Sequence, residues 1–372
     1  MPNFSEIYGA MDFQGIAESI ASNRSAAGVE SILEREAEEL TLEDFATLTS
    51  PGAADYLEAL AHRAREITRR RFGNTMQIYA PMYLSNECHS TCTYCGFSFG
   101  NKDIRRLTLT PEKARTEAEL LHAQGIRHVL LLTGEHYRAT PVEYLGEVCS
   151  RLNDLFPSIS IEVYPLEEAD YEKLRVTGVD GLAVYQETYD PVRYREVHIG
   201  GVKKRLEFRL DCPDRAGRAG IRKIAIGALL GLSHPAAEVY FLAAHARWLM
   251  KYYWRTQISI SLPRLRPAEG FESVPELSDR RFVQYLCALR VFLPDAGLIL
   301  STRESPLLRD NLSDICITTM SAGSRTDPGG YSDSGAAEQF SIEDTRSVDE
   351  IKSMLEAKGL EPLFTDWTRV MK

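Results

Sequence analysis

The sequence predicts an α/β protein: a (βα)₈ barrel of the TIM type with a helical extension before it and a loop-plus-helix segment after it. The chain has 372 residues, whereas such a barrel needs about 250 and leaves room for additions at both ends. From about residue 76, short β-rich runs alternate with longer helical patterns, which is typical of parallel βαβ units. We therefore expect an N-terminal helical extension over 1–75, the barrel over 76–320 and a barrel-capping segment over 321–372.

The first 75 residues predict helices rather than strands. Apolar residues recur at helical spacing in the stretches 28–36 and 56–64. The basic run Arg69-Arg70-Arg71 is short and is interpreted as the solvated end of a helix. No β-rich run interrupts this region.

The barrel prediction rests on eight β-rich runs and the helical patterns between them. The predicted strands are 77–84, 128–133, 159–164, 181–186, 223–228, 257–262, 297–302 and 314–319. The predicted intervening helices are 111–124, 141–155, 167–177, 235–251 and 279–292. A stretch rich in Gly, Ser and Asp follows over 321–335, and a last helix is expected over 348–358.

The composition excludes several classes of protein. Hydrophobic residues make up 44% and charged residues 26% of the chain, as in globular rather than disordered proteins. A net charge of −10 argues against a nucleic-acid partner. No window approaches the roughly 18 apolar residues of a membrane span, and the first residues lack the basic and apolar parts of a secretion signal. We expect a cytoplasmic protein without a membrane partner.

Three of the seven cysteines predict an iron–sulfur site. Cys88, Cys92 and Cys95 have the spacing C-x₃-C-x₂-C directly after the first predicted strand. Three thiolates serve three irons of a [4Fe–4S] cubane, so the fourth iron is left open to chelate the amino and carboxylate groups of a methionine moiety. The alternatives are buried free thiols or a zinc knuckle that includes His89, but the sequence offers no second pair of zinc ligands downstream. The other four cysteines lie in or beside apolar runs and are interpreted as core residues.

Beyond the cysteines, the chain resembles the radical S-adenosylmethionine (SAM) aromatic amino acid lyases, and most closely the 2-iminoacetate synthases, the tyrosine lyases of thiamine-thiazole biosynthesis. The resemblance extends from about residue 76 to the end. It is carried by YAPMYLSNEC (79–88), CGFS (95–98), LTGEH (132–136), VYQETY (184–189), PDRAGRAGI (213–221), GALLGL (227–232), LPRLRP (262–267), STRESP (301–306) and PGGY (328–331).

The resemblance implies a lyase that splits the Cα–Cβ bond of L-tyrosine into 2-iminoacetate and p-cresol, and that converts SAM into 5′-deoxyadenosine and methionine. It also implies a [4Fe–4S] cluster, SAM as cofactor, a flavodoxin- or ferredoxin-type reductant and a thiazole synthase as a possible partner.

Residues at the carboxyl ends of parallel barrel strands face the ligand, and several candidates for cofactor binding fall there. Backbone or carboxylate oxygens of Gly134 and Glu135 suit the ammonium group of SAM. Acidic and amide groups at the next strand ends could bind the ribose or the sulfonium of SAM. Glycine at the fifth strand end could let backbone groups pair with adenine. This second set comprises Glu162 with Tyr164, Gln186, Glu187, and Gly227 with Gly231. The alternatives are rim salt bridges for the carboxylates and a packing role for the glycines.

Arg303, at the seventh strand end, is the candidate anchor for the substrate carboxylate, because a guanidinium holds a carboxylate through two parallel hydrogen bonds. The alternative is a rim salt bridge with Glu304, in which case the anchor is sought at Arg264 or Arg266.

Two further catalytic candidates follow from the family resemblance alone. Ser321, just past the eighth predicted strand, corresponds to a serine that meets the substrate amino group, and Ser324 is a nearby rival. Tyr83, five residues before Cys88, corresponds to an active-site tyrosine of the family.

Three other functions stay open. A hydrogenase-maturation tyrosine lyase shares the first step but carries a second cluster on a cysteine-rich C-terminal extension, whereas the last cysteine here is Cys316. A tryptophan lyase that forms 3-methylindole-2-carboxylate shares the scaffold. A non-catalytic iron–sulfur electron carrier or redox sensor would turn over no SAM.

Overall fold

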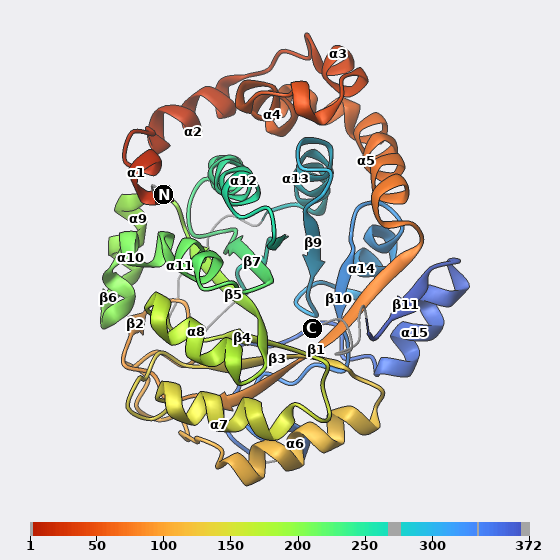
Figure 1. Cartoon of the computed structure of the whole chain (residues 1–372). Coiled ribbons are helices and arrows are strands. Elements are labelled where there is room, and N and C mark those ends of the chain that lie inside the picture. The colour runs from red at the N-terminus through yellow and green to blue at the C-terminus, as the bar shows by residue number, and fades with distance from the viewer. Residues whose placement is uncertain (1–2, 267–276, 333–334, 366–372) are drawn as a thin grey trace.

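The computed structural model describes residues 3–266, 277–332 and 335–365, and its centre is a closed barrel of eight parallel strands (Figure 1). The barrel strands are β1 (Thr75–Ser85), β3 (His128–Thr133), β4 (Ser158–Glu162), β5 (Val179–Glu187), β7 (Lys223–Ala228), β8 (Gln257–Ser261), β9 (Gly297–Leu300) and β10 (Thr319–Ser321). Pairing of β1 with β10, in which Gln77 lies opposite Thr319, closes the ring. The predicted fold class is confirmed.

The predicted eighth strand is wrong in its position. The stretch 314–318 does not form a strand, and β10 begins at Thr319. Asp314 ends helix α14 (Pro306–Ser313) and forms an ion pair with Arg65 of the N-terminal extension, 2.6 Å between Nη2 and Oδ2. The apolar residues after Asp314 are buried, which explains the strand-like pattern, but the ladder starts only beyond them. Ser321 is therefore the last residue of the strand.

The N-terminal extension is helical, as predicted, and forms an arc outside the barrel helices α12 (Pro235–Tyr252) and α13 (Asp279–Phe292) (Figure 1). The arc comprises α1 (Phe4–Tyr8), α2 (Phe13–Ser22), α3 (Val29–Glu34), α4 (Leu42–Thr49) and α5 (Leu57–Phe72). Phe4 stacks on His245 of α12, with ring centroids 3.9 Å apart. Phe45 packs on Phe292 of α13 at 4.9 Å. The extension thus adds a second apolar layer on one side of the barrel.

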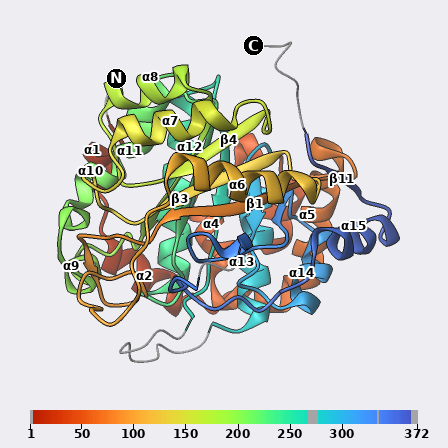
Figure 2. The same ribbon diagram turned by 90° about the horizontal axis from the view of Figure 1, so that it is seen from below.

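The remaining helices cover the rest of the barrel. They are α6 (Pro111–Ala123), α7 (Val142–Leu152), α8 (Glu168–Val176), α9 (Pro191–Val197), α10 (Leu206–Leu210) and α11 (Cys212–Arg218). Three small strands were not predicted: β2 (Thr91–Cys92) and β6 (His198–Gly200), which pair with each other, and β11 (Glu361–Leu363). β11 pairs with the start of β1 and lies beside the last helix, α15 (Val348–Ala357) (Figure 2).

The segment after β10 returns across the carboxyl ends of the strands. The backbone N–H groups of Glu343 and Asp344 donate to the carbonyl of Thr302, and the hydroxyl of Tyr331 donates to the carbonyl of Pro81 at 2.7 Å. Residues 333–334 and 366–372 of the predicted capping segment, and residue 267 of the LPRLRP motif, lie outside the described residues. Within the described part of the chain, no helix is long and apolar enough to cross a membrane.

Candidate active site

A cavity with an empty volume of about 990 Å³ opens at the carboxyl ends of the barrel strands. Strands β1, β4 and β5 supply one wall, the ends of β8 to β10 supply the opposite wall, and Gln339 and Phe340 of the returning segment complete it. Of the predicted site residues, six line the cavity: Tyr83, Cys95, Glu162, Glu187, Arg303 and Ser321.

Arg303 lies in this cavity without an ion-pair partner among the described residues. Its guanidinium lies 3.3 Å from the ring centroid of Phe340. Burial lowers the pKa of Arg303, and the nearby Tyr83, Glu187 and Glu162 oppose that shift. Its cationic head therefore has capacity to bind an anion.

The alternative interpretations of Arg303 do not match the contacts. Glu304 pairs with Arg264, whose Nε lies 2.9 Å from Oε2 of Glu304, rather than with Arg303. Arg264 also pairs with Asp279, and Arg266 binds Glu343 and the carbonyl of Arg303. Both rival arginines are thus already engaged.

Both candidate serines for the amine contact, Ser321 and Ser324, line the cavity, but only one of the two has a hydroxyl without a partner among the described atoms. Oγ of Ser321 accepts from the backbone N–H of Thr302 at 3.1 Å and also hydrogen-bonds Tyr79. Oγ of Ser324 is buried and has no partner among the described atoms. Ser324 was named as the rival on sequence position, and its hydroxyl is the one with unused hydrogen-bonding capacity.

Four tyrosines, Tyr79, Tyr83, Tyr94 and Tyr185, give the cavity an aromatic lining. Burial raises the pKa of Tyr79 to about 12 and raises the pKa of the other three well above the usual range, so all four phenols are neutral near pH 7. The hydroxyl of Tyr83 donates to Oε1 of Gln339 at 2.6 Å. This bond ties β1 to the returning segment across the cavity mouth.

At the end of β5, the two predicted residues Gln186 and Glu187 face different ways. The pairing of β5 with β7 shifts register between Tyr185 and Glu187, and Glu187 has a left-handed backbone with φ 68°. Side chains alternate along a strand, so Tyr185 and Glu187, two residues apart, both face the cavity. Gln186 lies between them, is fully buried, does not line the cavity and leaves both amide atoms without a partner among the described atoms.

The cysteine loop packs tightly on the end of β3. A Cβ at Gly134 would lie 2.2 Å from the carbonyl oxygen of Glu87 and 3.1 Å from Cβ of Cys88, so only glycine fits there. The N–H of His89 donates to the carbonyl of Glu135 at 2.9 Å. A Cβ at Gly227 would similarly meet the ring of Tyr185 at 2.6 Å, which favours the packing role for that glycine.

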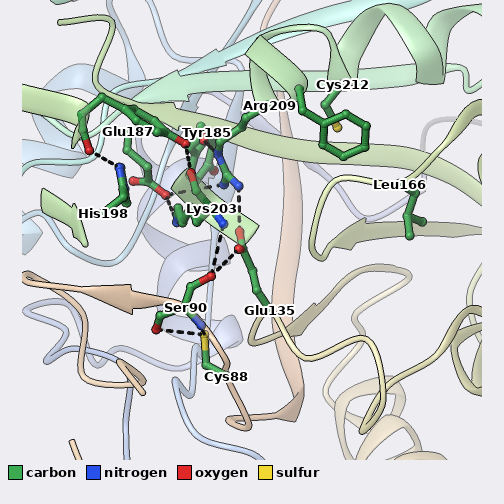
Figure 3. Close-up of polar contacts among 12 residues, drawn as sticks. Cys88, Ser90, Glu135, Leu166, Tyr185, Glu187, His198, Lys203, Arg209 and Cys212 are labelled. Atoms are coloured by element: carbon green, nitrogen blue, oxygen red, sulfur yellow. Dashed lines mark hydrogen bonds and ion pairs between the residues drawn. The ribbon is translucent and has the colours of Figure 1, made fainter. Parts of the chain in front are cut away.

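A buried ion-pair network connects the cysteine loop to β5 (Figure 3). Ser90 donates through Oγ to Glu135 at 3.0 Å, and Nη1 of Arg209 lies 2.8 Å from the other oxygen of Glu135. Arg209 also approaches Glu187 at 3.6 Å, and Nζ of Lys203 lies 2.7 Å from Glu187. Two carboxylates and two cations are thus matched within the protein.

The pKa values of the two cavity carboxylates reflect this network. Burial raises the pKa of Glu162 to about 7, with a further rise from Glu187. Burial also opposes the charged form of Glu187, but Lys203 and Arg209 outweigh it and lower its pKa. Near neutral pH, Glu187 is charged and paired, whereas Glu162 is close to its titration point.

The three clustered cysteines fit a [4Fe–4S] cluster. Cys88 and Cys92 are buried, Cys95 lines the cavity, and none forms a disulfide. Burial raises the pKa of Cys88 to about 11 and raises the pKa of the other two thiols as well, so thiolates here need a compensating metal charge. The sulfur of Cys88 accepts the backbone N–H of Ser90 at 3.4 Å, as cluster thiolates do.

No group of three or more His, Cys, Asp or Glu side chains within 3–266, 277–332 and 335–365 is arranged around a single metal ion. The zinc alternative would add His89 to the three cysteines. His89 stacks on His136 instead, with ring centroids 3.5 Å apart.

Sequence reasoning missed Lys203, Arg209, Tyr185 and Gln339. Lys203 lies in the short 3-10 helix Val202–Lys204 and Arg209 lies in α10, so the rule of strand ends could not find them. Gln339 comes from the returning segment, whose path over the cavity no local pattern predicts. Tyr185, by contrast, ends a predicted strand and lies in the VYQETY motif, and it could have been found there.

Comparison with known proteins decides the family. Residues 82–243 match the Radical SAM superfamily, and residues 261–361 match the Biotin and Thiamin Synthesis associated domain. The chain is 43% identical over 370 residues to the 2-iminoacetate synthase of Escherichia coli K12, covering 99% of this chain and 97% of that protein. The chain belongs to the 2-iminoacetate synthase family. The same enzyme of Salmonella typhimurium LT2 is 42% identical over the same shares of each chain.

Solved structures agree with this membership of the 2-iminoacetate synthase family. The [FeFe]-hydrogenase maturase HydG from Carboxydothermus hydrogenoformans superposes with a TM-score of 0.87 at 34% identity, covering 95% of this chain and 82% of that one. Methylornithine synthase superposes with a TM-score of 0.70 at 21% identity, covering 90% and 97%, and shows the shared fold. The predicted enzyme class, a radical SAM lyase with a [4Fe–4S] cluster and SAM, is confirmed.

Proposed function

We propose that the chain cleaves the Cα–Cβ bond of L-tyrosine into 2-iminoacetate and p-cresol for thiamine-thiazole biosynthesis, with SAM converted to 5′-deoxyadenosine and methionine. The observation that carries this proposal is the 43% identity to a 2-iminoacetate synthase over 99% of the chain. The cavity supports it, because an unpaired arginine, a free serine hydroxyl and an aromatic wall suit an aromatic amino acid.

The cysteine side of the site holds the cofactors in this proposal. Cys88, Cys92 and Cys95 hold the cluster, and when bound, the cluster and SAM supply the 5′-deoxyadenosyl radical that takes hydrogen from the substrate amino nitrogen. Gly134 and Glu135 border the cysteine loop and are proposed to meet the SAM ammonium group.

We propose roles in SAM binding for four further residues, two of which line the cavity and two of which do not. Glu162 and Glu187 face the cavity and can accept hydrogen bonds from the cofactor. Gln186 and Gly227 do not line it, so their part in cofactor binding is proposed to be support of Tyr185 and the β5 end.

The opposite side orients the amino acid. Arg303 is proposed to hold the tyrosine carboxylate, and Ser321 or Ser324 to meet the amine, which presents nitrogen rather than Cβ to the radical. Tyr83 and the returning segment close the mouth and exclude water from the reacting centre. Below about pH 7, where Glu162 is mostly protonated, the charge of Arg303 is available to the substrate.

The organisation and the partners follow as further parts of the proposal. The extension 1–75, the barrel 76–320 and the capping segment 321–372 act together, since the capping segment supplies Gln339 and Phe340 to the cavity. We propose a flavodoxin- or ferredoxin-type reductant, a thiazole synthase as recipient of 2-iminoacetate, and a cytoplasmic setting without nucleic-acid or membrane partners.

An anaerobic assay of the reconstituted enzyme tests the function. The assay contains SAM, dithionite and either L-tyrosine or L-tryptophan, and mass spectrometry identifies the products. We expect p-cresol in step with 5′-deoxyadenosine from tyrosine, and little product from tryptophan. Formation of 3-methylindole-2-carboxylate from tryptophan, with no p-cresol from tyrosine, would assign the chain to the tryptophan lyases. An absence of SAM turnover would favour the electron carrier or sensor.

A further inference from the structure

The cysteine loop has a second, solvent-facing side that the reaction does not use. A surface hollow with an empty volume of about 690 Å³ is lined by Cys92 and Cys95 on one side and by Ile199 on the other. Cys95 also lines the substrate cavity, so the loop separates an inner and an outer face. The outer face is where the cysteine loop lies directly against solvent.

Exposed aromatic and aliphatic side chains surround this hollow. Phe99 is 47% exposed, Tyr137 is 48% exposed and Ile199 is 56% exposed. They are not scattered, because the ring of His89 lies 6.1 Å from the rings of both Phe99 and Tyr137, and Ile199 shares the hollow with the cysteine loop. Strands β2 and β6 bring the two loops together at one edge of the molecule (Figure 1). Exposed apolar side chains that gather in one area mark interaction sites.

The same area is basic on an otherwise acidic protein. The stretch 98–106 has three cationic residues against one carboxylate, Asp103, and 198–205 has three cationic residues and no carboxylate, while the whole chain carries −10. Lys102 lies 3.3 Å from the ring centroid of Phe99, and Arg138 lies 5.9 Å from that of Tyr137. Lys203 is turned inward to Glu187, whereas Lys204 is exposed.

We propose that this surface docks an acidic one-electron carrier protein of the flavodoxin type. We name it the cysteine-loop face and define it by its exposed residues: Phe99, Lys102, Tyr137, Arg138, Ile199 and Lys204. The inference rests on the proposed function, since that function needs an external electron. The carrier gives up one electron to the cluster, so the carrier is oxidised and the cluster reduced by the same electron.

The chemistry of the face selects this occupant. Its cations complement an acidic protein and steer its approach, an effect that salt screens. Its exposed aromatic rings can pack on the flat edge of a flavin, whereas aliphatic side chains alone would not offer such a contact. The hollow places the partner over two cluster ligands while the returning segment keeps the substrate cavity closed on the other side.

Charge reversal at Lys102 and Arg138 tests the proposal on the cluster-loaded enzyme. We compare Lys102→Glu/Arg138→Glu with the control Lys251→Glu/Lys358→Glu, whose exposed lysines end α12 and α15 near the amino ends of the strands. Calorimetry measures the Kd for oxidised flavodoxin, and turnover measures the KM for reduced flavodoxin. We expect both constants to rise about 10-fold in the face variant at low salt and the difference to shrink at high salt.

A parallel reaction with dithionite separates this proposal from the proposed function. Dithionite is small and needs no docking surface, so both variants should form p-cresol within about twofold of the parent. Phe99→Ser should also weaken flavodoxin binding, whereas the control Trp254→Ser, at a still more exposed ring elsewhere, should not.

Three results would overturn the proposal. One is an unchanged Kd for flavodoxin in the face variants, and another is an equal loss in the controls. The third is a loss of affinity for ferredoxin or thiazole synthase with flavodoxin binding intact, which would assign the face to that other partner. Failure of the proposed function itself would appear differently, as no tyrosine cleavage with dithionite in the parent.

Discussion

Charged groups are paired within the protein on one side of the cavity and lack partners on the other. On the cysteine side, Glu135 and Glu187 are each paired with Arg209 or Lys203 inside the protein. On the β8–β10 side, Arg303 has no ion pair and Ser324 has no hydrogen bond among the described residues, while every phenol is neutral. An unsatisfied buried polar group costs stability unless a ligand satisfies it. We therefore propose that the first side, with its charges matched, supports the cofactors, and that the substrate supplies the missing partners on the second.

The largest effect should come from removing a cluster ligand. Cys92→Ala leaves one iron without a protein thiolate, so we expect loss of the [4Fe–4S] signal and of 5′-deoxyadenosine formation; Cys88→Ala and Cys95→Ala should behave alike. Iron content, electronic spectra and SAM turnover measure this. Cys149→Ala, at a buried helix position, is the control and should keep the cluster. A full cluster with SAM cleavage in Cys92→Ala would refute the ligand assignment.

Breaking the matched ion-pair network should give the next largest effect, a loss of stability. Removing one partner of a buried ion pair commonly costs about 3–5 kcal/mol because the other charge stays buried. We expect Arg209→Gln and Glu135→Gln each to lower the urea midpoint strongly, and the double variant to lose less than the sum. Additive losses would show that the two side chains act independently. Arg115→Gln, which breaks pairs with Glu119 and Asp154 at the surface, is the control and should lose little.

On the β8–β10 side, called the open side below, Arg303→Ala should weaken tyrosine binding and leave cluster assembly unchanged. Truncating one member of a desolvated charge pair commonly costs about 2–5 kcal/mol, which corresponds to at least ~30-fold in Kd. The parent should strongly prefer tyrosine to tyramine, which lacks the carboxylate, and Arg303→Ala should bind both alike. Arg303→Lys should recover part of the preference. Tyrosine affinity within about twofold of the parent would identify Arg303 as structural.

The difference between the two sides also explains what the sequence could predict. The strand count and the place of Arg303 in the cavity follow from local patterns and from the rule that barrel strands present ligands at their carboxyl ends, and the proposed cluster ligands follow from their spacing. Gln186 shows the limit of that rule, because a position near a strand end does not say which face the side chain takes, and Gln186 points away from the cavity that Tyr185 and Glu187 face. Lys203 and Gln339 enter from loops whose paths depend on tertiary packing, and no periodicity in the sequence encodes those paths.

The two serines give a smaller, sharper test of the open side. Ser324 has a free buried hydroxyl, whereas Ser321 already bonds Thr302 and Tyr79. A hydrogen bond contributes about 1 kcal/mol, so Ser324→Ala should raise the KM for tyrosine about fivefold. Ser321→Ala should change it less and should instead lower thermal stability. The reverse order of KM effects would return the amine contact to Ser321, as its position in the family implies.

The smallest effect concerns pH. Because the pKa of Glu162 is raised to about 7, its carboxyl is mostly protonated below pH 7 and becomes an anion above it. Arg303 is one of the charged groups that lower the pKa of Glu162. The Glu162 anion therefore competes with the substrate carboxylate for the guanidinium of Arg303. The KM for tyrosine in the parent should therefore rise a few-fold between about pH 6 and pH 8, and Glu162→Gln should flatten the profile. A parent profile that is flat, or one that Glu162→Gln leaves unchanged, would mean that the open side is set by Arg303 alone.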